Sequence, residues 1–428
     1  MTVDPTRMCE LLVGLGDVNV LEVAETEAGL RVTIETRGDR PVCGGCGGPL
    51  TVKDRDDVEH ADLPCFGRPT VLVWRKIRWE CSTRCGEGSF TETAPEIAVP
   101  RHRLTDRAGR WATVQVGKKG RPVCDVADEL GAGWDPVMDA VVAFGQALID
   151  DPDRFSDVEA LGMDETLRAK TGRYKTQQWS TQIVDVNVGQ LLDVIPGRDS
   201  TGPCEWLASR PQAWLDGIRW ATLDLSGPYR KVFDTMLPDA RQVADPFHVH
   251  KLANTRLDEC RRRVQNETFG HRGRKDDPLY RARRLLVRAD ERLDVKGRAK
   301  LLGLLAAGDP RGEVQTMWHA KQVVRSIYEH TDQDTALEFV TRLGHDLQDP
   351  EHPPEAHLLG RTLLRWRHQI CAWHASHVSN GPTEAVNNLI KRVKRVAFGI
   401  VNQRNWRIRA LLYAGKPNWD LLPTITPR

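Results

Sequence analysis

With 428 residues, the chain is too long for one ordinary hydrophobic core, and we expect several domains. Its 40% hydrophobic and 28% charged residues are typical of a soluble globular protein, and it has no run of about 18 apolar residues, so we expect no membrane-spanning helix and no membrane partner. The net charge of +2 hides an asymmetry, because residues 256–300 carry 15 Lys and Arg against 8 Asp and Glu. A basic surface on a balanced chain is typical of a protein with a polyanionic partner, although solvated helix faces would give the same pattern.

The N-terminus and the cysteine content bear on the cellular compartment. The first five residues, Met-Thr-Val-Asp-Pro, lack the basic and apolar regions of a signal peptide, so we expect no export. A large protein that is not exported keeps its thiols reduced. We therefore expect a cytoplasmic protein whose ten cysteines form no structural disulfides.

Four cysteines have the spacing of metal ligands. Cys43 and Cys46 form a C-x2-C pair followed by glycine, and Cys81 and Cys85 form a C-x3-C pair. Glycine next to such a cysteine lets the backbone N–H groups turn toward the sulfur. Two cysteine pairs joined by strands predict a zinc ribbon within residues 1–95, with one structural Zn²⁺ in a closed tetrahedral site.

The flanking pattern supports this interpretation. Residues 30–36 alternate between apolar and polar side chains and are expected to form a strand, and residues 70–80 are expected to form another that leads into the second cysteine pair. Buried thiols or a redox pair remain the alternatives. Cys65 and His60 lie between the two pairs and are weaker ligand candidates.

Residues 96–155 are expected to form a helix-turn-helix domain. A first helix is expected over 106–116, and the second begins near residue 123 with Ala127 four residues before Gly131. A small residue lets the two helices approach, and glycine permits the positive φ of the turn. The polar face of the following helix would then enter a major groove, whereas a purely structural helical hairpin is the alternative. Three cations in the connection are expected to contact phosphates: Lys118, Lys119 and Arg121.

The next segment has the element order of a ribonuclease H-like sheet. Three strands are followed by a helix, and then by a strand, a helix and a last short strand. The expected strands cover 158–166, 179–186, 190–195, 218–225 and 241–245, and the expected helices cover 201–216 and the residues after 227.

Three acids occupy comparable places in these elements. Asp164 and Asp224 each end an expected strand, and we expect those two strands to be neighbours in the centre of the sheet. Glu384 stands at the start of a later helix and is its only acid. A turn residue, a helix cap or a favourable helix dipole would account for any one of them alone. The same helix continues as a basic surface that includes Lys391, Arg392, Lys394 and Arg395.

Taken together, these motifs resemble the ISL3 family of bacterial insertion-sequence transposases. The resemblance covers nearly the whole chain, and the motifs occur in the family's order. The matching stretches are CGGCG at 43–47, GMDET at 162–166, LDLSGPY at 223–229, VADPFHVHK at 243–251, SNGPTEAVNN at 379–388 and KRVAFG at 394–399. The wide gap between the cysteine pairs and the C-x3-C form of the second pair depart from the commonest zinc spacing.

The resemblance implies a catalytic site of the Asp–Asp–Glu type. Asp164, Asp224 and Glu384 take the catalytic positions, and they would bind two Mg²⁺ or Mn²⁺ ions that activate the attacking oxygen and stabilise the leaving one. Asp245 and His248 resemble a secondary motif near the second acid. The steps of 60 and 160 residues between the three acids fit an insertion between the last two.

The implied architecture is an α/β multidomain chain with an all-helical insertion in the catalytic domain. Its expected parts are the zinc ribbon at 1–95, the helix-turn-helix at 96–155, the first part of the ribonuclease H-like domain at 156–255, the helical insertion at 256–355 and the last part with the basic helix at 356–428.

The implied function is a transposase that binds terminal inverted repeats, cleaves DNA at the element ends and joins the 3′-hydroxyls to target DNA. A homodimer or higher oligomer on double-stranded DNA, in the bacterial cytoplasm near the nucleoid, is expected. The alternatives are an inactive DNA-binding regulator derived from a transposase and a ribonuclease H-like resolvase or nuclease.

Overall fold

The computed structural model describes residues 9–10, 13–83, 85–86, 88–271 and 273–427, so the expectation about the first five residues lies outside it. The chain divides into two compact units. Within the described residues, no helix is both long and apolar enough to cross a membrane. The first unit comprises Met1–Ser156, Arg168–Gln177 and Asn388–Arg428, and the second comprises Asp157–Leu167 and Gln178–Asn387.

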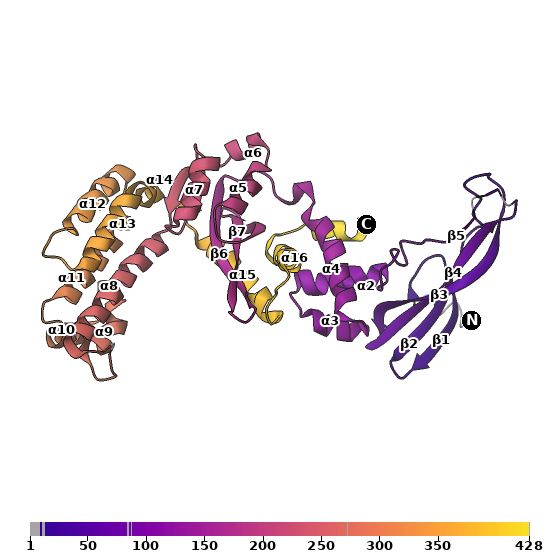
Figure 1. Ribbon diagram of the computed structural model, residues 1–428, viewed down its shortest axis with the longest axis horizontal. Coiled ribbons are helices and arrows are strands. Elements are labelled where there is room, and N and C mark those ends of the chain that lie inside the picture. Colours follow the sequence, from indigo (N-terminus) through magenta and orange to yellow (C-terminus); the bar gives the residue numbers. More distant parts are fainter. Residues whose placement is uncertain (1–8, 11–12, 84, 87, 272, 428) are drawn as a thin grey trace. The chain divides into compact units, whose positions relative to one another are not determined.

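The first unit begins with a five-stranded sheet (Figure 1). The strands expected at residues 30–36 and 70–80 are present as β2 and β4. The long strand β3 is not among the expected elements. Its exposed acids, among them Asp54 and Asp57, lack the apolar alternation of a half-buried strand. Charged side chains suit a strand at the edge of a sheet, where they discourage pairing with another chain. The strands are β1 (Val18–Thr26), β2 (Gly29–Thr36), β3 (Leu50–Cys65), β4 (Arg68–Cys81) and β5 (Ser89–Thr91), in the order β1-β2-β4-β3 with β5 beside β4.

Four helical segments follow the sheet. Gly131 ends the second of the expected helices with φ 62°, as the predicted positive-φ turn requires, and Ala127 is buried. The first expected helix ends in a π-helical turn. The segments are α2 (Asp106–Thr113), the π-turn η1 (Val114–Lys118), α3 (Val123–Leu130) and α4 (Trp134–Ile149).

The C-terminal helix α16 (Gln403–Ala414) packs against α4. A side chain at Gly145 would lie only 2.9 Å from Leu412, so the close approach of the two helices requires glycine there. The last segment returns to α2, where Arg110 donates a hydrogen bond to the carbonyl of Leu422. The N-terminal helices and the C-terminus therefore share one core.

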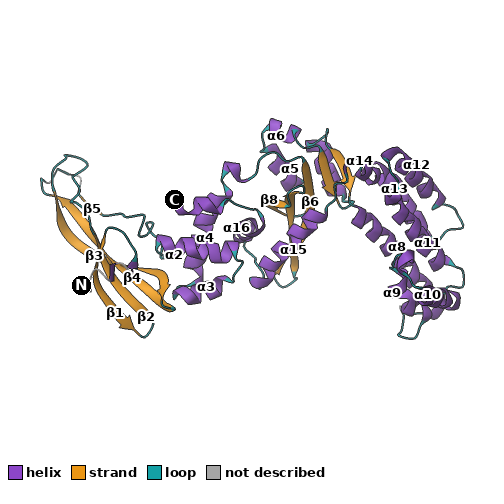
Figure 2. Cartoon of the chain, turned by 180° about the vertical axis from the view of Figure 1, so that it is seen from behind, coloured by secondary structure: helices purple, strands orange, loops and turns teal. Residues whose placement is uncertain are grey.

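Most of the other sheet lies in the second unit, in the order β10-β9-β6-β7-β8, while the β6–β7 hairpin end belongs to the first unit. β9 is parallel to both β6 and β10, and β7 is antiparallel to β8. Helices α5 and α7 pack against this sheet, whose strands are orange in Figure 2. Tyr229 and Phe233 of α7 are fully buried. The elements are β6 (Ala160–Thr171), β7 (Thr176–Asp185), β8 (Gln190–Pro196), α5 (Thr201–Ala208), α6 (Gln212–Asp216), β9 (Trp220–Leu223), α7 (Gly227–Met236) and β10 (Arg241–Ala244).

An all-helical region follows β10 in the second unit. Its first helix begins at Pro246, ten residues before the expected start of the helical insertion at 256. Proline favours the first turn of a helix, and here it directly follows the strand. The helices are α8 (Pro246–Phe269), α9 (Pro278–Leu286), α10 (Val295–Gly308), α11 (Glu313–Ser326), α12 (Gln333–Asp346), α13 (Pro354–Cys371) and α14 (Trp373–Ser376), followed by α15 (Gly381–Val396). Short 3₁₀ turns lie at Pro152–Arg154, Asp290–Arg292, Ile327–Glu329 and Trp419–Thr424.

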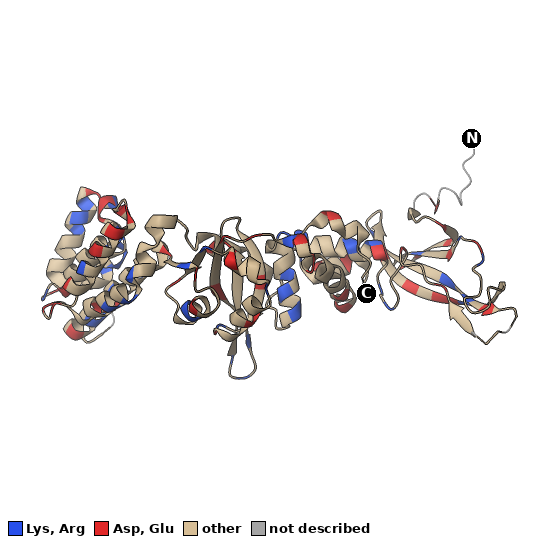
Figure 3. Cartoon of the chain, turned by 90° about the horizontal axis from the view of Figure 1, so that it is seen from above, with Lys and Arg blue, Asp and Glu red and all other residues tan. Residues whose placement is uncertain are grey.

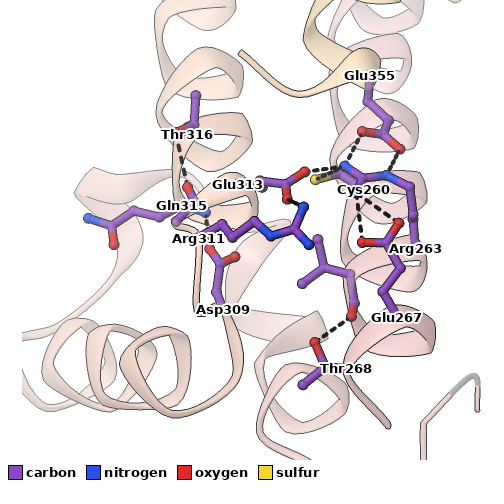
Figure 4. A network of polar contacts seen from close by, with 12 residues as sticks. Cys260, Arg263, Glu267, Thr268, Asp309, Arg311, Glu313, Gln315, Thr316 and Glu355 are labelled. Carbon is purple, nitrogen blue, oxygen red and sulfur yellow. Dashed lines mark hydrogen bonds and ion pairs between the residues drawn. The ribbon is translucent and has the colours of Figure 1, made fainter. Parts of the chain in front are cut away.

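Arg263 of α8 connects three helices of this region (Figure 4). Its guanidinium donates two hydrogen bonds of 2.9 Å to Glu355 of α13 and one to Glu313 of α11. Burial works to raise the pKa of Glu355, but the hydrogen bonds from Arg263 hold that pKa below its ordinary value. The basic residues of α8 therefore serve internal packing as well as surface charge.

Replacing Arg263 by alanine is expected to destabilise α8, α11 and α13 by about 3 kcal/mol, because it leaves the buried Glu355 carboxylate without its cation. The loss is largest at neutral pH. It fades as pH falls through the lowered pKa of Glu355, since a protonated carboxyl no longer needs the partner. Hydrogen–deuterium exchange of the three helices measures the effect. Arg262→Ala, at the neighbouring and more exposed arginine, is the control. Equal effects of the two substitutions would show that Arg263 does not hold the three helices together.

Candidate zinc site and candidate active site

The four predicted zinc ligands come together at one end of the first sheet. The Sγ atoms of Cys43, Cys46, Cys81 and Cys85 all lie within 4.8 Å of one another, and Cys43 and Cys81 are buried in a small core with Leu50, Ile77 and Trp79. Hydrogen bonding to Thr83 and to backbone N–H groups lowers the pKa of Cys81 to about 6. The thiolate is the form that binds zinc, so this set fits a structural Zn²⁺.

The two weaker ligand candidates lie elsewhere. His60 is buried beside Trp74, with 6.4 Å between the ring centroids, and burial lowers its pKa. Cys65 ends β3 and pairs with Arg68 at the hairpin turn. Neither belongs to the cysteine cluster, because the strand pairing carries both residues away from the two cysteine pairs.

Cys81→Ser is expected to lower bound zinc from one ion per chain to a small fraction of that, because a tetrahedral site loses a thiolate ligand. Cys65→Ser should retain the full complement. Elemental analysis of both purified variants and of the unsubstituted chain tests the assignment. Equal zinc in the Cys81→Ser variant and the unsubstituted chain would remove Cys81 from the ligand set.

Two of the three expected catalytic acids lie on neighbouring strands. Asp224 follows the last residue of β9, as expected. Asp164 does not end its strand, because β6 continues to Thr171. The last residue of β6 that pairs with β9 is Gly162, opposite Thr222, so Asp164 lies where its neighbour strand stops rather than where its own strand stops.

Glu165 joins these two acids. Asp164, Glu165 and Asp224 each offer an oxygen within 4.8 Å of the others. No pattern in the sequence singles out Glu165, because successive residues of a strand normally point to opposite faces. Its pKa is raised by burial and by the charge of Asp224, and hydrogen bonding to Tyr229 opposes the shift.

Glu384 lies in a second group, with Asp245 and His248. The His248 Nε2 is 3.1 Å from Glu384 Oε1 and 3.9 Å from Asp245 Oδ2. The two groups adjoin, since the charges of His248 and Glu384 both act on Asp224. The residues expected from the secondary motif therefore lie with the third acid, and the first two acids lie with Glu165.

The N-terminal part of α15 is fixed to the sheet by amide side chains. Asn387 donates a hydrogen bond from Nδ2 to Asp164 Oδ2, and Thr222 donates one of 3.0 Å to Asn380 Oδ1. A Cβ on Gly162 would lie 2.4 Å from the Oγ1 of Thr383. Glycine is therefore needed where the helix crosses the strand. Asn380 and Asn387 lie within the block of the sequence that suggested Glu384, but only their contacts reveal their positioning role.

The electrostatics of the first group favour a cation. Burial raises the pKa of Asp164 to about 6, and the charge of Asp224 adds to the shift while a hydrogen bond from the Glu165 N–H opposes it. Burial likewise raises the pKa values of Asp224 and Asp245. Within the described part of the chain, Asp224 Oδ1 and Asp245 Oδ2 are buried without a hydrogen-bond partner. Converging carboxylates with such unpaired oxygens fit a hard divalent cation.

Two family models match the chain. One, described as a transposase, is the ISL3 model of the Asp–Asp–Glu class and matches residues 161–410, and the other, described as the zinc-finger of transposase IS204/IS1001/IS1096/IS1165, matches residues 39–85. Two curated proteins from Mycobacterium tuberculosis strains (CDC 1551 / Oshkosh and ATCC 25618 / H37Rv) are similar. Each is a transposase for insertion sequence element IS1557, 25% identical over 436 residues that cover 92% of both chains. The chain thus belongs to the ISL3 family of insertion-sequence transposases.

Proposed function

We propose that the protein binds the terminal inverted repeats of an insertion sequence, cleaves the DNA at the element ends and joins the resulting 3′-hydroxyls to target DNA. The observation that carries this proposal is the convergence of half-buried carboxylates from β6 and from the end of β9, beside the first turn of α15. The strand order β10-β9-β6-β7-β8 supports a ribonuclease H-like catalytic domain. We also propose that the zinc ribbon ends at residue 95, the helix-turn-helix at 155, the first part of the catalytic domain at 255 and the helical insertion at 355.

Asp164, Asp224 and Glu384 are the proposed catalytic acids, with Glu165, Asp245 and His248 beside them. Two Mg²⁺ or Mn²⁺ ions held there would activate water or the 3′-hydroxyl and neutralise the phosphate. Asn387 orients the Asp164 carboxylate, and His248 holds one oxygen of Glu384. Hydrolysis of the phosphodiester leaves a 3′-hydroxyl, and attack of that hydroxyl on a target phosphodiester releases the target's own 3′-hydroxyl. The proposal needs no covalent protein–DNA intermediate.

The proposed DNA-binding surface combines the zinc ribbon, α2–α4 and the basic end of α15. Lys391, Arg392 and Arg395 are exposed, as are Lys118 and Lys119, which supports contacts to phosphate (Lys and Arg are blue in Figure 3). Arg121 is less available, because it forms a 2.7 Å ion pair with Glu129. Lys394 is half-buried, and burial lowers its pKa. Double-stranded DNA and a homodimer or higher oligomer are the proposed partners.

Two other functions are less well supported. An inactive regulator derived from a transposase has no use for clustered carboxylates, and all three proposed catalytic acids are present here within such clusters. A ribonuclease H-like resolvase or nuclease would cut DNA without joining it to a target. The zinc ribbon and the helices that follow it favour binding to a particular DNA end instead.

Asp164→Asn, Asp224→Asn and Glu384→Gln are each expected to lower end cleavage and strand transfer by about 100-fold or more, while leaving end binding within about 3-fold. Each change removes a proposed metal ligand and spares the cations that contact phosphate. Gel-shift, cleavage and strand-transfer assays on one labelled end fragment measure these effects. Glu159→Gln, at an acid that pairs on the surface with Arg219, is the matched control.

The outcomes separate the candidate functions. Cleavage without transfer by the unsubstituted chain would favour the nuclease, and binding without cleavage would favour the regulator. Near-normal cleavage by one of the three variants would remove that acid from the catalytic set.

A further inference from the structure

The turn between α15 and α16 displays an exposed aromatic side chain. Phe398 is 93% exposed and has a φ of 51°, a conformation that bulky residues rarely adopt. Two backbone hydrogen bonds of 3.1 Å hold the turn, from Phe398 N–H to the carbonyl of Arg395 and from Gly399 N–H to that of Lys394. An ordered turn that keeps an apolar ring in water at a conformational cost indicates a functional constraint.

A pocket of about 190 Å³ lies beside this turn within the first unit. Phe398 lines it together with Trp134, which is 46% exposed at the start of α4. Arg409 also lines it and is 3% exposed. Among the described residues its Nε has no hydrogen-bond partner, although another of its nitrogens donates to the carbonyl of Arg121 at 3.5 Å. The pocket thus combines two aromatic rings with a buried donor that needs an acceptor.

The charge around the turn identifies the occupant. Lys391, Arg392 and Arg395 are exposed on the preceding helix, and Arg404 is exposed on the following one. An apolar surface meant for another protein does not need four exposed cations around it, whereas a nucleic acid supplies phosphates for the cations and flat rings for the aromatic side chains.

We propose that Phe398 enters the base stack of bound DNA and that the pocket receives the displaced base. The base would lie against Trp134, and Arg409 would donate to an acceptor on its edge. Apolar side chains unstack base steps in this way in other DNA-binding proteins, and pockets that accept a flipped base combine stacking with edge hydrogen bonds. The inference rests on the proposed transposase function, since α15 begins with Glu384 in its first turn and ends two residues before Phe398.

The test uses the full chain and a labelled end duplex. Phe398→Ala is expected to lower cleavage by about 10-fold or more with end binding within about 3-fold, because the base is no longer displaced. A set of duplexes that each lack one base near the cut should contain a member on which Phe398→Ala cleaves within about 3-fold of the unsubstituted chain. Phe398→Trp should retain cleavage on the intact duplex.

Tyr174→Ala is the matched control, because Tyr174 is 88% exposed at the turn between β6 and β7 and belongs to none of the proposed sites. It should leave cleavage unchanged. Full cleavage of the intact duplex by Phe398→Ala would overturn the inference and leave the proposed function standing. A loss of cleavage that none of the duplexes with a missing base restores would do the same. If that unrescued loss came with dissociation of an oligomer in light scattering, the turn would be a contact between copies of the chain. No cleavage by the unsubstituted chain would overturn the proposed function, and this inference with it.

Discussion

The repulsion between half-buried carboxylates is the constraint around which the second unit is arranged. Asp164 and Asp224 are brought together because β6 and β9 are parallel neighbours and β9 stops just before the second acid. Burial and mutual repulsion raise the pKa of Asp164 to about 6, so at neutral pH the folded chain carries an electrostatic cost that the unfolded chain does not. Natural proteins retain such costs at functional sites, where a bound cation offsets them.

Helix α15 connects the proposed chemistry to the proposed DNA contacts. Its first turn carries Glu384, and its third and fourth turns carry exposed cations, so one element presents both the acid and the phosphate-binding groups. Asn387 and Gly162 fix the start of the helix against β6, the first by a hydrogen bond to Asp164 and the second by leaving room. A small shift of this first turn would move Glu384 relative to Asp245 and His248. The amide and glycine contacts are therefore as important to the site as the acids themselves.

The sequence predicted those features that depend on local pattern. Alternation located β2, the element order located the strands of the second sheet, and the Cys43 and Cys81 pairs located the metal cluster. Gly131 marked its turn because few other residues accept a positive φ. The exposed acids of β3 hid a strand that only its ladder with β4 defines. Likewise, the position of Asp164 relative to Asp224 depends on where β9 ends, and the pairing of β6 with β9 joins residues far apart in the sequence.

Local sequence pattern also could not predict which acids lie together in each of the two groups. Glu165 joins Asp164 and Asp224, and Glu384 lies with Asp245 and His248, because the crossing of α15 over the sheet decides which side chains meet. The resemblance named five of these six residues without their grouping. Which of them bind metal during catalysis stays a prediction.

Thermal unfolding with and without divalent metal tests the central claim most directly. If the site is a set of repelling carboxylates that needs a cation, Asp224→Asn should raise the melting temperature of the metal-free chain at neutral pH, because it removes one of the repelling charges. Mg²⁺ or Mn²⁺ should then stabilise the unsubstituted chain and have little effect on the variant. A variant that is less stable than the unsubstituted chain without metal, and that responds equally to added metal, would contradict the account.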